Sequence, residues 1–455
     1  MRSAPSVKPR AAAGARARRG WMLFDWAAQP FHTLIVTFVF APYFASAVAS
    51  DPVAGQAMWG WAATIGGLAV ALLAPVLGAL ADATGPRKPW ILAFSALYVG
   101  GSAALWFSEP GGAAPVWVLV AFVTALVGAE FATVFTNAMM PDLAPRAELG
   151  RLSGAGWALG YAGGVIALAL TLLLFAENEA GVTLSGRPPI LGLDPETREG
   201  TRAVGPFAAL WYLVFVIPLF LWTPDAPRTG ALRGAARRGL RELGASLRSL
   251  PERRGLAWFL GASMFYRDAL NGFYTFGGIY AAGMLGWSIV QVGVFGIVAA
   301  VVGALGAWFG GRADSAFGPK PVVVVCVLVL IAASALGVSV SRDAVFFVVP
   351  VAEGSTAPDV LFYLVGALVG AGGGALQAAS RTLLVAEAEE ERMTAGFGLY
   401  ALSGKATAFL APFAVALTTA WTGSQQAGIA PVIALFVVGL LMLGPVRGRL
   451  EPAAA

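Results

Sequence analysis

The chain has 455 residues, of which 58% are hydrophobic and 12% charged, and its formal net charge is +5 at pH 7. Soluble globular domains carry about 25% charged residues and about 45–50% apolar residues. The composition therefore excludes an ordinary water-soluble enzyme, a disordered chain and a fibrous protein. Because one membrane-spanning helix needs about 20 apolar residues, the sequence predicts an integral membrane protein with about twelve such helices.

Twelve long apolar segments are the predicted elements, and we expect each of them to be an α-helix that spans the membrane. Only helices and closed barrels satisfy backbone polar groups in lipid, and these segments lack the alternating pattern of barrel strands. The first segment follows a basic tail at residues 1–20 and is too long for a signal peptide. The predicted spans are residues 21–49, 58–80, 89–107, 115–139, 152–175, 206–223, 256–284, 289–310, 321–340, 358–385, 395–421 and 428–446.

Lys and Arg residues predict the orientation, because cytoplasmic loops carry an excess of both. Four arginines lie in loops on one side, and all other basic residues outside the predicted spans lie on the opposite side. The four are Arg187, Arg198, Arg202 and Arg342. We therefore expect a multi-pass protein of the inner cell membrane with both termini in the cytoplasm, as an even number of spans requires. Since the basic residues are spread over membrane loops, we expect contact with lipid and not with nucleic acid.

Residues 224–255 separate the two halves that we expect at residues 21–223 and 256–446, and a second cytoplasmic tail follows at 447–455. Apolar residues recur at three- and four-residue steps from Leu232 to Leu250, with several arginines off that stripe. This pattern predicts a basic amphipathic helix on the inner membrane surface, which ends at Pro251. A solvated linker helix is the alternative.

An internal repeat indicates that the two halves share one architecture. The loop after the second span and the loop after the eighth span contain the same order of glycine, aspartate, glycine-proline and basic residues. The shared positions are Gly78, Asp82, Gly85, Arg87 and Lys88 in the first loop, and Gly310, Asp314, Gly318 and Lys320 in the second. Two parallel six-helix halves are a known transporter plan.

These loops resemble the signature between the second and third helices of the major facilitator superfamily, although the second copy has one extra residue and lacks the arginine. The chain is also similar to the vacuole-effluxer-like branch, the bacterial relatives of autophagy-related amino-acid effluxers, in residues 24–27, 137–142, 153–161, 277–283 and 397–406. The resemblance implies an all-α membrane protein with twelve helices in two pseudo-symmetric halves, the major facilitator fold. It also implies secondary transport, with Asp82 and Asp314 in a latch between the halves. Amino-acid export is known only for the eukaryotic relatives.

Polar side chains at helical spacing mark four of the predicted spans. An ionisable group in hydrocarbon is costly, so its presence there indicates function. The sets are Asp25, Gln29, His32 and Thr33 in the first span, Glu130, Thr133 and Asn137 in the fourth, Arg267, Asp268, Asn271 and Tyr274 in the seventh, and Gln377, Ser380 and Arg381 in the tenth. Each set lies on one helical face, and the resembled superfamily lines its substrate path with these four helices. We therefore expect a common polar cavity.

The charged candidates balance, since three acids accompany Arg267, Arg381 and Lys405 within the predicted spans. A buried charge without a partner is costly, so we expect internal ion pairs that exchange partners or admit an ion. Structural roles are the alternatives for several residues. Arg267 and Asp268 could form a static pair, Lys405 could be a clamp, Asp25 could cap its helix, and His32 could be a hydrogen-bonded spacer.

Glycines recur every four residues in three predicted spans. They are Gly156, Gly160 and Gly164 in the fifth, Gly306 and Gly310 in the eighth, and Gly366, Gly370 and Gly374 in the tenth. Small residues let helices approach closely, so we expect helix contacts at these positions, either static or shared by two conformations.

The sequence predicts a monomeric secondary transporter that moves a small solute by alternating access. Proton coupling through Glu130, Asp268 or Asp25 is the favoured mechanism, with facilitated diffusion as the alternative, and both charge signs suit a zwitterion such as an amino acid. One cysteine and one histidine cannot build a zinc site, and no nucleotide-binding loop is present, so we expect no metal, cofactor or enzyme activity. A non-transporting membrane sensor or scaffold is the alternative, and a membrane transferase is disfavoured because no nucleophile and base stand together.

Overall fold

The structure is a computed structural model that describes residues 14–111, 115–144, 149–227, 244, 248–388, 399–400, 402–404 and 406–448. Its helices are α1 (Ala15–Pro30), α2 (Phe40–Tyr43), α3 (Pro52–Thr84), α4 (Lys88–Ala104), α5 (Pro115–Asn137), α6 (Leu149–Leu174), α7 (Glu199–Arg202), α8 (Val204–Trp222), α10 (Arg254–Leu285), α11 (Ile289–Phe317), α12 (Pro319–Val338), α13 (Ala357–Glu387), α15 (Leu410–Thr422) and α16 (Gln425–Met442). The strands are β1 (Ala344–Val345) and β2 (Val349–Pro350). The predicted amphipathic helix at 224–255 lies mostly outside the described residues.

Ten helical segments within the described residues are long and apolar enough to cross a membrane. Two more helices complete the predicted set. α10 has 32 residues but carries Arg267 and Asp268 in its middle, and α15 is apolar but has only 13 residues. The predicted all-α membrane fold is confirmed, and twelve spans are consistent with these helices.

The first span differs from the prediction at its beginning. α1 begins at Ala15, so the last residues assigned to the basic tail are helical, which suits their Ala and Arg content. The span then continues to Val48 through two π-helical segments, η1 (Phe31–Phe38) and η2 (Phe44–Val48), on either side of α2. Pro30 lies directly before η1, and Pro42 lies between η1 and η2. Since proline removes a helical hydrogen bond, the π segments fit its positions.

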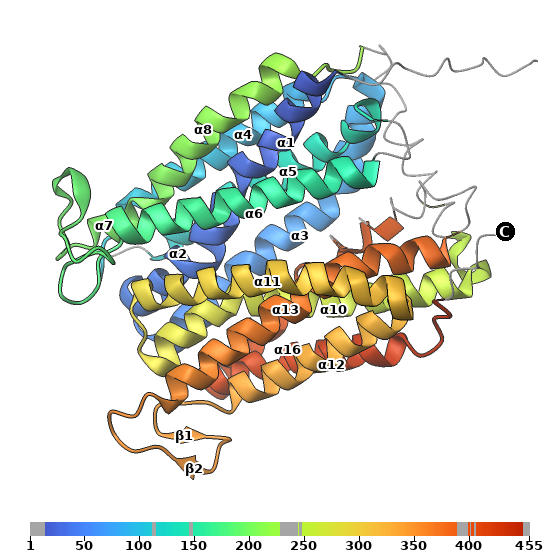
Figure 1. The fold of residues 1–455 in the computed structure, drawn as a ribbon. Helices are drawn as coiled ribbons and strands as arrows, with labels where there is room; N and C mark the ends of the chain where they lie inside the picture. Colours follow the sequence, from blue (N-terminus) through green and yellow to red (C-terminus); the bar gives the residue numbers. More distant parts are fainter. Residues whose placement is uncertain are drawn as a thin grey trace, which may run out of the picture.

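The helices form two layers, α1 to α8 and α10 to α16, as Figure 1 shows. Equivalent helices pair in the same way within each layer. α3 and α4 both pack on α5, as α11 and α12 both pack on α13, and α1 packs on α8 as α10 packs on α16. The internal repeat in the sequence is therefore a repeat in three dimensions. Between the layers, α3 packs on α15 and α6 on α11.

Both ends of the described chain lie at one end of the molecule, which we call the terminal end, and the opposite end is the far end (Figure 1). At the far end of the first layer, the loop after α6 is tied down by buried polar groups. Glu177 is fully buried and accepts a hydrogen bond from the Thr201 hydroxyl at 2.7 Å. Burial raises the pKa of Glu177 above its ordinary value. Arg202 donates to the Trp106 carbonyl at 2.8 Å, so three stretches of loop form one unit.

Close packing of α4 and α5 depends on Gly128. A Cβ at this position would lie 2.3 Å from the Tyr98 backbone nitrogen and 2.7 Å from the Phe94 carbonyl oxygen. Backbone atoms cannot turn aside as a side chain can. The two helices therefore need glycine there in order to touch.

We expect Gly128→Val to lower the free energy of unfolding by about 1–3 kcal/mol, because overpacking would separate α4 from α5. Thermal unfolding of the purified protein in detergent measures the effect. Gly100→Val is the matched control, since a Cβ at Gly100 meets no atom within 4 Å. Equal melting temperatures for the two variants would contradict this account of the contact.

Candidate functional site

Side chains from both halves meet where α6 faces α10 and α13. The Tyr161 hydroxyl on α6 interacts with the Gln377 side chain on α13 and lies close to the Arg381 guanidinium. Tyr274 on α10 is near enough to interact electrostatically with Tyr161. Together with Trp157, which is also on α6, these residues form what we call the interhalf cluster: Trp157, Tyr161, Tyr274, Gln377 and Arg381.

Arg381 is the cation of the interhalf cluster. Its guanidinium carbon lies 5.8 Å from the centre of the Trp157 ring, so the arginine of one half faces an aromatic face of the other. Arg202 pairs with Glu109 and Arg342 with Asp359, and neither ion pair involves Arg381. Arg381 is half-buried. A half-buried guanidinium that lies against an aromatic ring retains donors for an anionic ligand.

Arg267 and Asp268 do not pair with each other, which contradicts the static pair weighed from the sequence. Adjacent residues of a helix point in different directions. Arg267 stacks over the Tyr400 ring, with its guanidinium carbon 4.3 Å from the ring centre, and donates to the Tyr400 carbonyl at 3.0 Å. Its charge is therefore held by the chain segment before α15.

Asp268 is 2% exposed and binds the beginning of α15. Its Oδ2 accepts a hydrogen bond from the Ala411 backbone nitrogen at 2.8 Å, and Ala411 is in the first turn of that helix. A carboxylate at a helix N-terminus is favourable. Its Oδ1 is buried and has no hydrogen-bond partner among the described residues. Asp268 thus links α10 to α15 and keeps one acceptor available.

The polar face of the first span packs on the glycine face of α6. A Cβ on Gly156 would lie 2.5 Å from Asp25 Oδ2, and one on Gly164 would lie 2.6 Å from Thr33 Oγ1 and 2.8 Å from Gln29 Cγ. The two stripes that the sequence showed separately therefore face each other within one half. Asp25, Gln29 and Thr33 are half-buried beside them. His32 lies in η1, where the widened helical turn alters the spacing of its face.

The remaining candidates are divided between buried, half-buried and exposed positions. Glu130 and Thr133 on α5 are half-buried, and Asn137 at the end of α5 is exposed, as is Asn271 on α10. The Thr133 hydroxyl donates to the Ala129 carbonyl at 2.8 Å. Ser380 is fully buried, and its hydroxyl lies 2.8 Å from the Tyr266 hydroxyl. Lys405 lies outside the described residues.

The glycines of the predicted tenth span, which is α13, lie where helices touch, as do those of the fifth span, which is α6. A Cβ on Gly370 would lie 2.2 Å from the Ala299 carbonyl oxygen, and one on Gly306 would lie 2.4 Å from the Ala371 carbonyl oxygen. Gly366 faces the Phe295 ring. α11 and α13 are thus pressed together along their backbones, as the glycine spacing predicts.

The two signature loops end their helices in the same way. Gly85 after α3 has φ 90°, and Gly318 after α11 has φ 84°, a conformation that favours glycine. Lys88 donates to the Phe220 carbonyl at 2.8 Å, and Lys320 donates to the Gly444 carbonyl at 3.1 Å. In each half, the loop lysine therefore binds a carbonyl at or just after the end of that half's last helix.

Asp225 binds the first signature loop, and the sequence analysis did not identify it. It follows α8, and its two carboxylate oxygens accept from the backbone nitrogens of Arg87 and Lys88 at 2.7 and 3.0 Å. It thereby caps the beginning of α4. These contacts lie within one half, and the expected latch between the halves through Asp82 and Asp314 stays a prediction. The side chain of Asp82 is outside what the structure describes.

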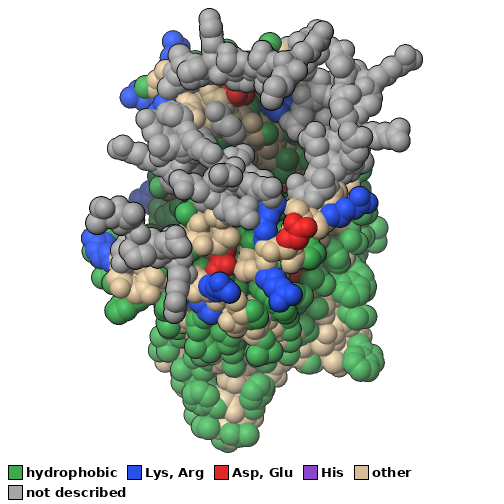
Figure 2. Space-filling model, turned by 90° about the vertical axis from the view of Figure 1, so that its right-hand side faces the viewer, with side chains coloured by type: hydrophobic (Ala, Val, Ile, Leu, Met, Phe, Trp, Pro, Cys, Tyr) green, Lys and Arg blue, Asp and Glu red, His purple; other side chains and the backbone are tan. Residues whose placement is uncertain are grey.

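The halves are joined near the far end by hydrogen bonds across α3, α15 and α16. Gln56 is fully buried and donates to the Thr419 hydroxyl at 2.8 Å and the Gln425 carbonyl at 3.3 Å. Gln425 donates to the Pro52 carbonyl at 2.9 Å. Figure 2 looks onto the terminal end, where the surface is hollowed and Lys and Arg side chains gather nearby. The far end is therefore the joined end of this conformation.

We expect Gln56→Leu to favour separation of the halves at the far end. Two hydrogen bonds with a net value of about 1 kcal/mol each are lost, which corresponds to a population change of roughly tenfold or more. The measurement is a pulsed electron paramagnetic resonance distance between spin labels at Ser50→Cys and Thr422→Cys, in a Cys326→Ser background. A longer-distance population is expected to grow.

Gln426→Leu is the control for this change, because the neighbouring Gln426 donates to the Val338 carbonyl within its own half. An unchanged distance distribution in Gln56→Leu would show that these bonds do not hold the halves together.

Comparisons with known proteins agree with this architecture. The family described as "Vacuole effluxer Atg22 like" matches residues 52–449. An uncharacterized MFS-type transporter, YxiO of Bacillus subtilis (strain 168), is 24% identical over 438 residues, which cover 93% of each chain.

Solved structures share the fold at low identity. A bacterial homologue of the human lysosomal transporter Spinster has a TM-score of 0.65 and 14% identity, with 96% of this chain and 98% of the other covered. The nucleoside transporter NupG gives 0.66 and 12%, with 95% and 99% covered. A D-xylose-proton symporter gives 0.64 and 16%, with 95% and 98% covered. The chain is thus a transporter of the major facilitator fold and belongs to the vacuole effluxer Atg22-like family.

Proposed function

We propose that the protein moves a small zwitterionic solute, of the amino-acid class, across the membrane by alternating access. The observation that carries this proposal is the interhalf cluster. Its residues come from α6 in one half and from α10 and α13 in the other. A solute bound among them contacts both halves, so rocking of one half against the other exposes it to each side in turn.

The chemistry of the interhalf cluster suits a carboxylate together with an ammonium group. Arg381 offers a planar guanidinium, which binds carboxylates with two parallel hydrogen bonds. Trp157 and Tyr161 offer aromatic faces, which attract an ammonium group. Gln377 supplies both a donor and an acceptor. This combination supports a zwitterion over a sugar, which has no charge to match Arg381.

Protons are the coupling ion that the carboxylates support. Asp25 and Glu130 are half-buried within the spans, and Asp268 is buried with one free acceptor. A proton taken up by such a carboxylate removes a charge from hydrocarbon and changes its interactions with cations. Facilitated diffusion is the alternative, and the response to a pH gradient separates the two.

The proposed setting is the inner cell membrane, with the terminal end in the cytoplasm and the protein as a monomer. The excess of Lys and Arg at the terminal end supports this orientation. The hollow seen in Figure 2 would then face the cytoplasm. In this conformation the solute would enter or leave through the cytoplasmic side.

We expect Arg381→Lys to raise the KM for amino-acid counterflow in proteoliposomes about 10- to 100-fold with a smaller change in maximal rate. The lysine keeps the charge and loses the two-pronged geometry, which is worth about 1.5–3 kcal/mol. The probes are radiolabelled α-amino acids, first selected by thermal shift. Arg312→Lys is the control, because Arg312 is exposed and stacks on Trp308 of its own helix.

Competition by amines tests the carboxylate directly. Each transported amino acid is paired with the primary amine that lacks its carboxylate, and the amine is expected to compete poorly. Equal competition by the two would remove carboxylate recognition from Arg381. Absence of counterflow for every solute, with folded protein in the vesicles, would support a non-transporting sensor instead.

We expect Glu130→Gln to abolish the response of net transport to an imposed pH gradient while counterflow at equal pH continues. The amide cannot exchange a proton, whereas it keeps the size of the side chain. Fluxes with the vesicle interior acidic, neutral and alkaline provide the measurement. An equal pH response in the wild type and the variant would exclude Glu130 as the coupling group, and Asp268→Asn and Asp25→Asn would then be tested in the same way.

A further inference from the structure

The hairpin β1–β2 connects α12 to α13 at the far end and carries an apolar tip. Ala344 pairs with Pro350 and Val345 with Val349, so residues 346–348 form the turn. The apolar run extends from Ala344 to Ala352 and is bounded by charged residues, Arg342 and Asp343 before it and Glu353 after it. Its residues do not alternate with polar ones as they would in a strand with one face in water.

The tip exposes its large hydrophobic side chains. Phe346 is 54% exposed, Phe347 61%, Val348 79% and Val349 48%, whereas Val345 is buried against the body. Exposed aromatic and aliphatic side chains in one contiguous group are unfavourable in water and usually mark an interaction surface. The tip therefore calls for an apolar environment outside the protein.

The position of the hairpin indicates which environment that is. In Figure 1 the hairpin lies where α12 and α13 reach the far end, to one side of the helix bundle. In Figure 2, where the view is along the helices, the lower edge of the molecule is a protrusion made mainly of hydrophobic side chains. The space beside membrane-spanning helices at their ends is the lipid headgroup region. Aromatic residues are enriched at this depth in membrane proteins.

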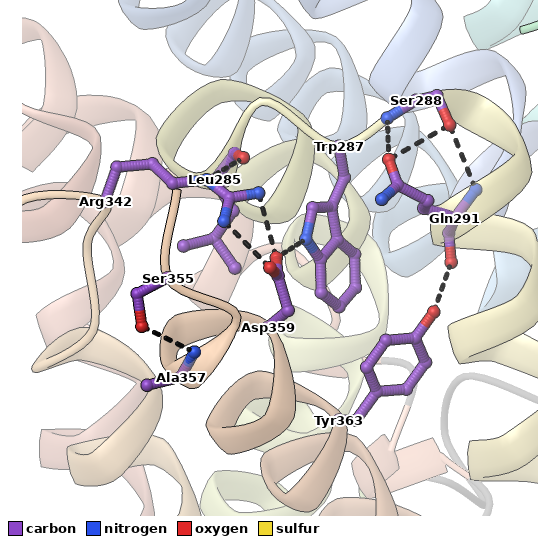
Figure 3. Close-up of polar contacts among 9 residues, drawn as sticks. All are labelled: Leu285, Trp287, Ser288, Gln291, Arg342, Ser355, Ala357, Asp359 and Tyr363. Atoms are coloured by element: carbon purple, nitrogen blue, oxygen red, sulfur yellow. Dashed lines mark hydrogen bonds and ion pairs between the residues drawn. The ribbon is translucent and has the colours of Figure 1, made fainter. Parts of the chain in front are cut away.

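The base of the hairpin is fixed to the second half by ionic and hydrogen bonds (Figure 3). Arg342 holds the Asp359 carboxylate with two nitrogens, at 2.9 and 2.8 Å, and the Trp287 indole donates to the same carboxylate at 2.5 Å. Arg342 also donates to the Leu285 carbonyl. This clamp joins the hairpin to the beginning of α13 and to the turn between α10 and α11. The tip is thus held beside the bundle.

The backbone of the turn is unusual for its residues. Phe346 and Phe347 have φ 52° and 64°, a left-handed conformation that glycine and asparagine adopt more readily. Both phenylalanines occupy it at a cost in free energy, although neither is buried in the protein. Such an outlier suggests a role for the side chains themselves. Contact of the two aromatic rings with lipid is such a role. Glycine would fit the turn but would give it no side chain to insert into lipid.

We propose that the hairpin tip, Phe346 to Val349, inserts into the lipid headgroup region of the leaflet at the far end and anchors the second half in the membrane. Stable protein interfaces bury about 800 Å² on each partner, far more than four side chains can provide. The charged residues on both sides of the apolar run fit the polar boundary of a bilayer. This inference does not depend on the identity of the transported solute.

The single cysteine of the chain makes a direct test possible. In a Cys326→Ser background, Val348→Cys is labelled with the fluorophore NBD, and the full-length protein is reconstituted into phosphatidylcholine–phosphatidylglycerol vesicles. Glu353→Cys is the matched control, five residues away in the same loop and also exposed. Lipids with a spin label near the headgroup are expected to quench the label at 348 at least about twofold more than at 353, and aqueous iodide is expected to do the reverse.

Replacement of Phe346 and Phe347 by serine tests whether these rings hold the tip in lipid. The label at 348 is then expected to become accessible to iodide, while the melting temperature, which reports the folded bundle, stays close to that of the parent. Equal iodide quenching at 348 and 353 in the parent protein would overturn the proposal. Disulfide-linked dimers of unlabelled Val348→Cys in dilute vesicles would also overturn it, because the tip would then contact a second copy.

Discussion

Hydrocarbon offers no hydrogen-bond partner to a polar group, so a polar group within the spans is stabilised by a partner in the protein or in a solute. This constraint explains where the charged residues of α10 go. Asp268 caps α15 through Ala411, and Arg267 lies on the ring and carbonyl of Tyr400. Both contacts join α10 to the segment around α15. Arg381 lies against the Trp157 ring of the other half instead, and this difference sets it apart as the cation that we propose a solute uses.

The spans and their repetition could be predicted because they depend on local composition. Long apolar runs make helices wherever they are, and the glycine that the repeat places after α3 and α11 has a positive φ angle in both loops. The beginning of α1 at Ala15 was missed because polar residues with good helical propensity can extend a span beyond the lipid.

The partners of the candidate residues could not be predicted, because spacing gives the face of a helix and not what the face meets. The sequence showed a polar stripe with Asp25 and a glycine stripe with Gly156, but only the packing of α1 on α6 shows that they form one contact. Trp157 and Tyr161 lie in residues 153–161, which carry the family resemblance, but they were not among the candidate site residues. Gln56 is a lone amide near a helix end, and its partners are more than 360 positions away in the chain. Such pairs are tertiary, and a single sequence carries no signal for them.

The loop lysines have a consequence for how the molecule can change shape. Lys88 and Lys320 each fasten the third helix of a half to a carbonyl at or just after the end of its sixth, so each half is closed upon itself. A rotation of one closed unit against the other breaks none of these bonds. The energy gap between two conformers then depends on the contacts between the two units, and a bound molecule that contacts both units can shift it.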